Sequence, residues 1–287
     1  MLAFALAALS AVLFGAMAVA IRASFRSGSD PEAVSFATTA GALAVCLVLA
    51  APFAGGLTWH SVWPFLVAGL IAPGLSQILF VRAIEAIGAS RTAILVGVSP
   101  LLSALFAISL LGEPLRAGLV VGTVAIVGGA LALVSTRSAT ARLTAAGAAA
   151  GIVAAALISA RDNFVRWADT GNSVPGAVAG AACLASATVL IATVLLLARR
   201  PLLPPSLRPV WRAAAASGVL FGLAYGAVFT AFDHGRVTIV APLYATESLW
   251  AVLWSGLVLR RAEAIGPRLV GAALLMVAGG VLIGVSR

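Results

Sequence analysis

The sequence has no lysine, and its 287 residues include only nine acidic residues and two histidines. Charged residues make up 9% of the chain and hydrophobic residues 62%, with a mean hydropathy of +1.13. A soluble domain of this length cannot bury that much apolar surface, whereas lipid can solvate it. The composition therefore excludes a soluble globular protein and predicts an integral membrane protein.

Further shortages narrow the function. Cys46 and Cys183 are the only cysteines, and each stands alone in an apolar segment, which excludes a disulfide framework and a metal-binding spacing. No GxxxxGK[ST] motif is present, so an ATP-driven pump has no support. All eighteen basic residues are arginines that flank apolar segments, where they anchor at lipid headgroups. We therefore expect the lipid bilayer, and no nucleic acid, as a partner.

Ten apolar segments each have about the 17–25 residues that cross a bilayer. Backbone polar groups at that depth must pair within their own segment, so we expect helices. The first segment lacks a basic start and is too long for a signal-peptide core, so it is interpreted as a span. The expected spans are 2–21, 33–51, 62–83, 92–111, 115–134, 144–161, 175–198, 211–232, 237–259 and 267–285.

An even number of spans puts both termini on one side of the membrane. The linkers after spans 1, 3, 5, 7 and 9 hold thirteen arginines, and the other side holds five. The positive-inside rule then places both termini outside the cytoplasm.

Residues 62–134 and 210–285 echo each other. In each stretch a tryptophan lies near the start of the first span, and a short polar motif lies in the next span. A loop with one glutamate follows, and the last span contains a glycine pair. The matching positions are Trp63 with Trp211, Ser99-Pro100 with Glu247-Ser248, Glu113 with Glu263, and Gly128-Gly129 with Gly279-Gly280. Each half then has five spans, so the second half enters the membrane from the opposite side. Such inverted repeats typically support alternating access in transporters; a duplication without transport is the alternative.

These motifs resemble the drug/metabolite transporter superfamily, in its EamA-like ten-helix family, over nearly the whole chain. The motifs that carry the resemblance are Gly97-Val98-Ser99-Pro100, Leu111-Gly112-Glu113-Pro114, Gly122 and Gly128-Gly129, then Val240-Ala241-Pro242-Leu243, Glu247-Ser248-Leu249-Trp250, Glu263, Gly271 and Gly279-Gly280.

The resemblance implies an all-α integral membrane fold of ten transmembrane helices, formed by EamA-like repeats at 1–136 and 144–287. It implies a cavity lined mainly by spans 1, 3, 4, 6, 8 and 9, and a permease without cofactors that exports or exchanges amino acids, small metabolites or drugs. The Ala, Gly and Arg bias is typical of GC-rich bacteria, so we expect the inner (plasma) membrane. Relatives usually keep both termini in the cytoplasm, against the arginine count. The family's usual Arg near the start of span 2 is absent, and the linker 52–61 carries only His60 as a basic residue.

Glu247 is the sharpest candidate for a substrate-binding residue. It lies near the middle of the segment 237–259, roughly 15 Å from either interface at 1.5 Å per residue. An ionised carboxylate there costs about 2.5–3.5 kcal/mol even on the lenient insertion scale. The Glu247 carboxyl group therefore needs a water-filled cavity, a charged or hydrogen-bonding partner, or a bound proton. Binding and release of such a proton is what a proton-coupled carrier requires. The alternative is a protonated glutamate that only bonds a neighbouring helix. Ser99, at the matching position, would place a hydroxyl across the cavity, and an amine-bearing substrate would find a counter-charge in Glu247.

Three aromatic residues are further candidates for the cavity. Tyr244 lies three residues before Glu247 on nearly the same helix face, Tyr225 in span 8 could face it, and Trp250 follows in the same motif. Core or interfacial packing is the alternative for the tyrosines. Gln77 follows Pro73-Gly74, where a helix should kink and free carbonyl groups, and an amide at that depth favours a cavity or an interhelical bond.

Charged residues at span ends are candidate gates. Arg161 and Asp162 end span 6, and Asp162 could pair with Arg166 four residues on. The pattern favours an interfacial, snorkelling cluster over a pathway mouth. Arg82 and Glu85 after span 3, and Asp233 and His234 after span 8, are symmetry-related charged exits, for which ordinary solvated helix ends are the alternative.

Glycines recur every fourth residue in span 8, at Gly218, Gly222 and Gly226. Such stripes let helix backbones approach closely, so we expect a packing role. A monomer and a homodimer both remain open.

The leading hypothesis is a secondary transporter for a small-molecule substrate, with a proton as a candidate coupling ion. A membrane-embedded enzyme acting on lipid-linked substrates is the runner-up, but it would need clustered acids or histidines for a metal, and the sequence shows no such cluster. A non-transporting assembly factor is the third hypothesis.

Overall fold

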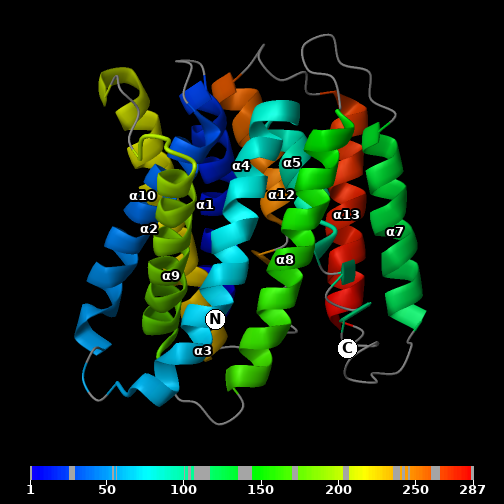
Figure 1. Ribbon diagram of the computed structural model, residues 1–287. Coiled ribbons are helices and arrows are strands. Elements are labelled where there is room, and N and C mark those ends of the chain that lie inside the picture. Colours follow the sequence, from blue (N-terminus) through cyan, green and yellow to red (C-terminus); the bar gives the residue numbers. More distant parts are fainter. Residues whose placement is uncertain are drawn as a thin grey trace.

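The computed structural model describes residues 2–25, 30–53, 55, 57–99, 101–102, 105–106, 117–134, 144–169, 174–202, 207–234, 240, 243–244, 246–259 and 266–285. The regular elements in these ranges are helices that run side by side as a bundle (Figure 1). They are α1 (Leu2–Ser24), α2 (Pro31–Ala50), η2 (Ala51–Phe53), α3 (Trp59–Gly69), η3 (Leu70–Leu75), α4 (Ser76–Ile87), α5 (Ala89–Val96), α7 (Ala117–Val134), α8 (Ala145–Asp169), α9 (Gly176–Leu197), α10 (Leu207–His234), α12 (Glu247–Trp254), η4 (Ser255–Leu259) and α13 (Pro267–Val285).

The predicted all-α membrane fold is confirmed. Among the residues that the structure describes, six helical segments are long and apolar enough to cross a membrane, and three shorter apolar helices accompany them. The helices α1, α2, α7, α9 and α13 lie within a few residues of their predicted spans. The spans predicted at 92–111 and 237–259 fall partly outside the described residues. The candidate spans Ala145–Val165 and Ala214–His234 also lie within a few residues of the predictions. The helices that contain them are longer, because α8 continues to Asp169 and α10 begins at Leu207.

Polar residues mark the starts of helices near the bundle's ends. The Asp30 carboxylate accepts the backbone N–H groups of Glu32 and Ala33 at 3.0 and 3.4 Å, and Pro31 follows at the first helical position of α2. Thr58 and Ser61 form a reciprocal capping box at the start of α3. Both devices satisfy backbone donors that have no partner inside the helix.

The third span is broken near its middle, as predicted from Pro73-Gly74. The segment η3 separates α3 from α4, and Ala72 leaves helical geometry with φ −147° and ψ 126°. A proline lacks the N–H that a helix needs and crowds the preceding turn, so the backbone bends there. Gln77 stands in the first turn of α4, directly after the break.

Helices from the two ends of the sequence interleave in the bundle. Helix α1 packs along α10 and against α12, α2 packs between α9 and α10, and α4 packs against α8. The helices α7 and α13 pack on each other at one edge (Figure 1). Both termini lie at the same end of the bundle, as an even number of spans requires (Figure 1).

The glycine stripe of α10 packs against α2, which confirms its predicted role. A Cβ at Gly218 would lie 2.9 Å from the Cα of Gly41, and a Cβ at Gly222 would lie 2.6 Å from the Cβ of Val45. A Cβ at Gly226 would also meet a side chain of α2 at 2.6 Å. The absence of Cβ atoms therefore sets how closely these two backbones approach.

Both cysteines are buried and free, as expected. The Cys46 thiol on α2 lies 3.3 Å from the carbonyl oxygen of Gly222 on α10, to which it donates a hydrogen bond. Cys183 on α9 approaches the third span, where a Cβ on Gly69 would lie 2.5 Å from the Cys183 Cα. The cysteines thus act as small residues at helix crossings.

Candidate functional site

Five polar side chains from three parts of the sequence converge inside the bundle. Arg161 and Asp162 come from α8, Tyr225 from α10, Tyr244 from the segment before α12, and Glu247 is the first residue of α12. We call them the central polar cluster. The sequence analysis had placed three of them in the cavity and two at a gate, and the structure brings all five together.

Arg161 organises this cluster. Its Nε lies 2.8 Å from Oδ1 of Asp162, and a terminal guanidinium nitrogen donates a hydrogen bond to the Tyr225 hydroxyl. The guanidinium carbon also lies 5.5 Å from the centroid of the Tyr225 ring and 5.8 Å from that of Phe229. The Tyr244 hydroxyl donates to Oδ2 of Asp162 at 3.4 Å. Carboxylate, hydroxyl and aromatic faces together compensate a cation held away from water.

The interpretation of Arg161 as a snorkelling interfacial residue is wrong. Because α8 runs on to Asp169, Arg161 stands well inside the helix, and only 11% of its side chain is exposed. The run of polar residues in 161–166 had suggested the end of the span. Asp162 forms an ion pair with its neighbour Arg161, and the predicted pair with Arg166 falls on a side chain outside the described residues.

Glu247 differs from the other charged members of the cluster. It is half-buried in the first turn of α12 and close enough to Asp162 and Tyr244 to interact with them electrostatically. Within the described part of the chain, its carboxylate has no hydrogen bond and no ion pair. Among the five named residues, Arg161 carries one positive charge and Asp162 one negative charge, and an ionised Glu247 adds a second negative charge.

The remaining predicted cavity residues lie apart from this cluster. Ser99 is buried, its hydroxyl donates to the Val96 carbonyl at 2.6 Å, and its own carbonyl accepts from Ser159 of α8 at 2.8 Å. Gln77 is 4% exposed, and its amide nitrogen has no partner among the described atoms. Trp250 is 36% exposed, and its backbone packs where α1 crosses α12.

Sequence reasoning missed two contributors to the central polar cluster and its surroundings. Phe229 follows Tyr225 by four residues, a spacing that places both rings on one helix face, and this signal could have identified it. Ser159 connects α8 with the fourth span through Ser99. It gave no distinctive signal, because a serine in an apolar helix usually bonds its own helix, as Ser159 also does with Ala155.

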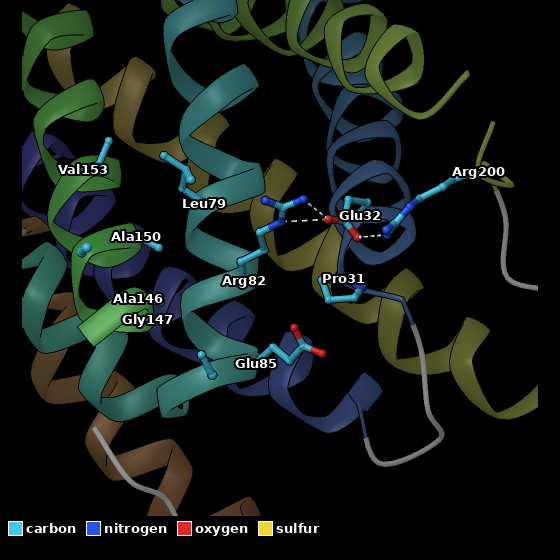
Figure 2. Close-up of a pocket in the computed structure, with 12 residues that line it drawn as sticks. Pro31, Glu32, Leu79, Arg82, Glu85, Ala146, Gly147, Ala150, Val153 and Arg200 are labelled. Atoms are coloured by element: carbon cyan, nitrogen blue, oxygen red, sulfur yellow. Dashed lines mark hydrogen bonds and ion pairs between the residues drawn. The ribbon is translucent and has the colours of Figure 1, made fainter. Parts of the chain in front are cut away.

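A second set of charges closes the end of the bundle opposite to the termini, and we call it the Glu32 network. The Arg82 guanidinium bonds Oε1 of Glu32, with its Nε at 2.8 Å, and a nitrogen of Arg200 lies 2.9 Å from Oε2 (Figure 2). The same Arg200 nitrogen lies 3.0 Å from Oδ2 of Asp30. The Glu32 side chain is 8% exposed, whereas those of Arg82 and Arg200 are 52% and 48% exposed.

Glu85 lies next to this network without joining it. Its backbone carbonyl accepts a hydrogen bond from Arg22 of α1 at 2.8 Å, which caps the end of α4. Its carboxylate has no ion-pair partner in the part of the chain that the structure describes. At the predicted charged exit after span 3, Arg82 therefore forms an ion pair with Glu32, whereas the Glu85 carboxylate forms none among the described residues.

The charged exit at the other end of the bundle is simpler. Oδ2 of Asp233, at the end of α10, accepts the backbone N–H of Gly176 at 2.8 Å and so caps the start of α9. His234 is exposed, and its Nδ1 lies 3.0 Å from the Thr230 carbonyl oxygen of its own helix. Over the residues that are described, no group of three or more His, Cys, Asp and Glu side chains could hold a metal ion.

Comparison with known proteins confirms the predicted family resemblance over the first half of the chain. Residues 1–135 match the model of the EamA-like transporter family. No curated protein sequence matches the chain. One solved crystal structure shares the fold over 98% of this chain and 95% of its own, with a TM-score of 0.69 and 22% sequence identity. The apolar helices and this match indicate a multi-pass membrane protein whose first half resembles a family of membrane transporters.

Proposed function

We propose that this chain, whose first half matches the EamA-like transporter family, is a secondary active transporter of the bacterial inner membrane. It exports amino acids or other small metabolites or drugs by alternating access. The observation that carries this proposal is the central polar cluster, a set of charged and hydroxyl groups that meet inside a largely apolar helical bundle. Ionisable residues at such depth are rare, and where they occur they usually mark a substrate or ion pathway.

Two inverted five-helix repeats, 1–136 and 144–287, form the moving units. Helix contacts support this division, because most of them have a counterpart when the two halves are exchanged. The matching pairs are α1–α10 with α8–α4, α2–α10 with α9–α3, and α1–α12 with α8–α5. The pairs α2–α9, α5–α12 and α7–α13 each map onto themselves.

A close backbone approach repeats in the same way. Helices α2 and α10 meet at Gly41 and Gly218, and α9 and α3 meet at Cys183 and Gly69, where a Cβ on Gly69 would lie 2.1 Å from the Cys183 carbonyl oxygen. Gly41 and Cys183 occupy similar places in the second helix of each half, as Gly69 and Gly218 do in the third. The two crossings are the natural pivots of a rocking motion.

The two charged exits act as gates. Arg82 and Glu32 join the end of α4 to the start of α2 at one end of the bundle, and Asp233 and Gly176 join the end of α10 to the start of α9 at the other. In an alternating-access cycle one gate opens while the other stays closed. The exposed side chains of Glu85 and His234 stand beside the two gates.

The charge balance of the central polar cluster favours an amine-bearing substrate. The Arg161 guanidinium is already engaged by Asp162 and Tyr225, so it offers little to a substrate carboxylate. Glu247 offers an open carboxylate instead. A proton and a substrate cation would compete for it, which is a direct way to couple proton entry to substrate release.

Flux measurements in proteoliposomes test this function. We expect saturable counterflow of a small amine-bearing metabolite, driven by an inward proton gradient. Glu247→Gln should insert and fold normally but lose at least about tenfold in flux or its pH dependence, because the amide cannot exchange a proton. Glu247→Asp is the matched control and should retain measurable coupled flux. Unchanged transport by Glu247→Gln from pH 5 to 8 would show that Glu247 does not carry the proton.

A further inference from the structure

We propose that the pocket beside the Glu32 network binds one membrane phospholipid with a primary-ammonium headgroup, of the phosphatidylethanolamine class. This site is separate from the central polar cluster, and its occupant is not transported. The inference rests on the shape of the pocket, on donors left open by the network and on the position of Glu85.

The pocket combines a charged rim with an apolar wall. Its volume is about 630 Å³, within the roughly 300–1,000 Å³ of small-ligand sites. It lies where α2 begins, α4 ends, α8 begins and α9 has just ended. The apolar wall runs along one face of α8, and Val153, on that wall, is 47% exposed toward the outside of the bundle. The lining residues are Pro31, Glu32, Leu79, Arg82, Glu85, Ala86, Ala146, Gly147, Ala149, Ala150, Val153 and Arg200.

The pocket lies at the depth where the headgroup of a membrane lipid meets its acyl chains. The charged residues stand at helix ends, where a membrane-spanning bundle meets the headgroup layer. The wall runs along α8 from Ala146, in its first turn, to Val153, farther from that end of the bundle (Figure 2). A free polar solute would use the rim and leave this wall bare, whereas a phospholipid uses both.

The two arginines at the rim keep donors for a phosphate. Arg82 uses Nε and one terminal nitrogen on Glu32, and Arg200 uses a single terminal nitrogen on Glu32 and Asp30. The other guanidinium nitrogens have no partner among the described residues, and about half of each side chain is open. Guanidinium groups favour phosphate oxygens because their planar forks match the geometry of the anion.

Glu85 supplies the complementary charge. It lies one helical turn after Arg82, a spacing that puts both side chains on one face of α4, with about 5–6 Å between Cβ atoms. Its carboxylate points toward the start of α2, beside Pro31 and Arg82 (Figure 2). An ammonium group two carbons from a phosphate can therefore reach Glu85 while the phosphate meets Arg82. A headgroup without an ammonium leaves Glu85 unpaired, and a trimethylated one cannot donate a hydrogen bond to it.

Native mass spectrometry of the purified full-length chain tests the proposal. The protein is titrated in detergent with phosphatidylethanolamine, phosphatidylcholine and phosphatidylglycerol that carry identical acyl chains. We expect a single tightly bound lipid, with phosphatidylethanolamine preferred about tenfold over both others, the effect of one charged hydrogen bond. Equal binding of the three lipids would overturn the proposal.

Variants then assign the preference to the pocket. Glu85→Gln should abolish the preference for phosphatidylethanolamine over phosphatidylglycerol. Ala149→Phe, which fills the apolar wall, should weaken all three lipids. Arg200→Gln should weaken phosphatidylethanolamine and phosphatidylglycerol alike, whereas Arg199→Gln is the matched control, since Arg199 is also exposed but does not line the pocket. If Arg199→Gln and Arg200→Gln behave identically, the pocket is not the lipid site.

A soluble competitor separates a lipid from a free zwitterion. Glycerophosphoethanolamine carries the same headgroup without acyl chains, and we expect it not to displace the lipid at millimolar concentration. Displacement with an affinity equal to that of the lipid would mean that the pocket takes soluble zwitterions and would refute a lipid site. Because binding is measured without flux, this outcome is independent of the proposed transport function.

Discussion

Side chains of different chemistry join the helix ends at the two ends of the bundle. At the end opposite to the termini, two arginines meet the buried carboxylate of Glu32, so charge meets charge between three helix ends. At the other end, Asp233 meets only the backbone N–H of Gly176. Both contacts join the end of one helix to the start of another. The two contacts should therefore differ in free energy and in salt sensitivity, because the side chains that join the helix ends determine both.

Among the variants compared here, a change in the middle of the bundle should cause the largest loss of stability. Asp162→Asn removes the carboxylate that balances Arg161, whose side chain is only 11% exposed. Leaving a buried charge without its partner costs about 3–5 kcal/mol, so this variant should show the largest loss of thermal stability in detergent and the loss of flux. A melting temperature like that of the wild type would mean that water reaches Arg161 freely.

The Glu32 network should show the next largest effect. Glu32→Gln removes the negative charge that pairs with both arginines. Arg200 keeps Asp30 as a partner, and water will solvate Arg82 and Arg200 because both are about half exposed. We therefore expect a loss of about 1 kcal/mol, as for partly exposed ion pairs. The loss should shrink as salt rises, because screening weakens the wild-type pairs. Thermal unfolding at low and high salt measures both, and a salt-independent loss would contradict an ionic closure.

The Asp233 contact should show the smallest effect. Asp233→Ala removes one side-chain acceptor from the first turn of α9, a loss of about 0.5–1 kcal/mol by analogy with helix caps. Raising the salt concentration should change the loss of stability caused by Asp233→Ala less than it changes the loss caused by Glu32→Gln. The same salt series measures it, and an effect larger than that of Glu32→Gln would reverse the comparison between the two ends.

Much of the fold and part of the site could be predicted from the sequence. Apolar runs of bilayer length predict helices, because each such run must satisfy its own backbone. The break after Ala72 follows from Pro73, and the close packing of α10 follows from the glycines at every fourth position. Glu247 and Tyr244 stood out because polar groups are costly at membrane depth, whatever surrounds them.

Contacts between distant residues could not be predicted in this way. Arg82 and Glu32 are 50 positions apart, and Arg161 and Tyr225 are 64 apart. Their meeting depends on which helices neighbour each other and on how each is rotated. The length of α8 also escaped prediction, because polar residues inside a long helix look like its end when their partners on other helices are unknown.

The sequence alone determined that this chain has the composition of a membrane protein, where most of its helices lie and which few polar groups are candidates for function. These follow from the local cost of transferring residues into hydrocarbon. Only the tertiary structure decided that Arg161 points inward, that Glu247 is left open and that Glu32 gathers two arginines. Those outcomes depend on the relative position of helices, and a one-dimensional pattern of hydropathy contains no information about rotation around a helix axis.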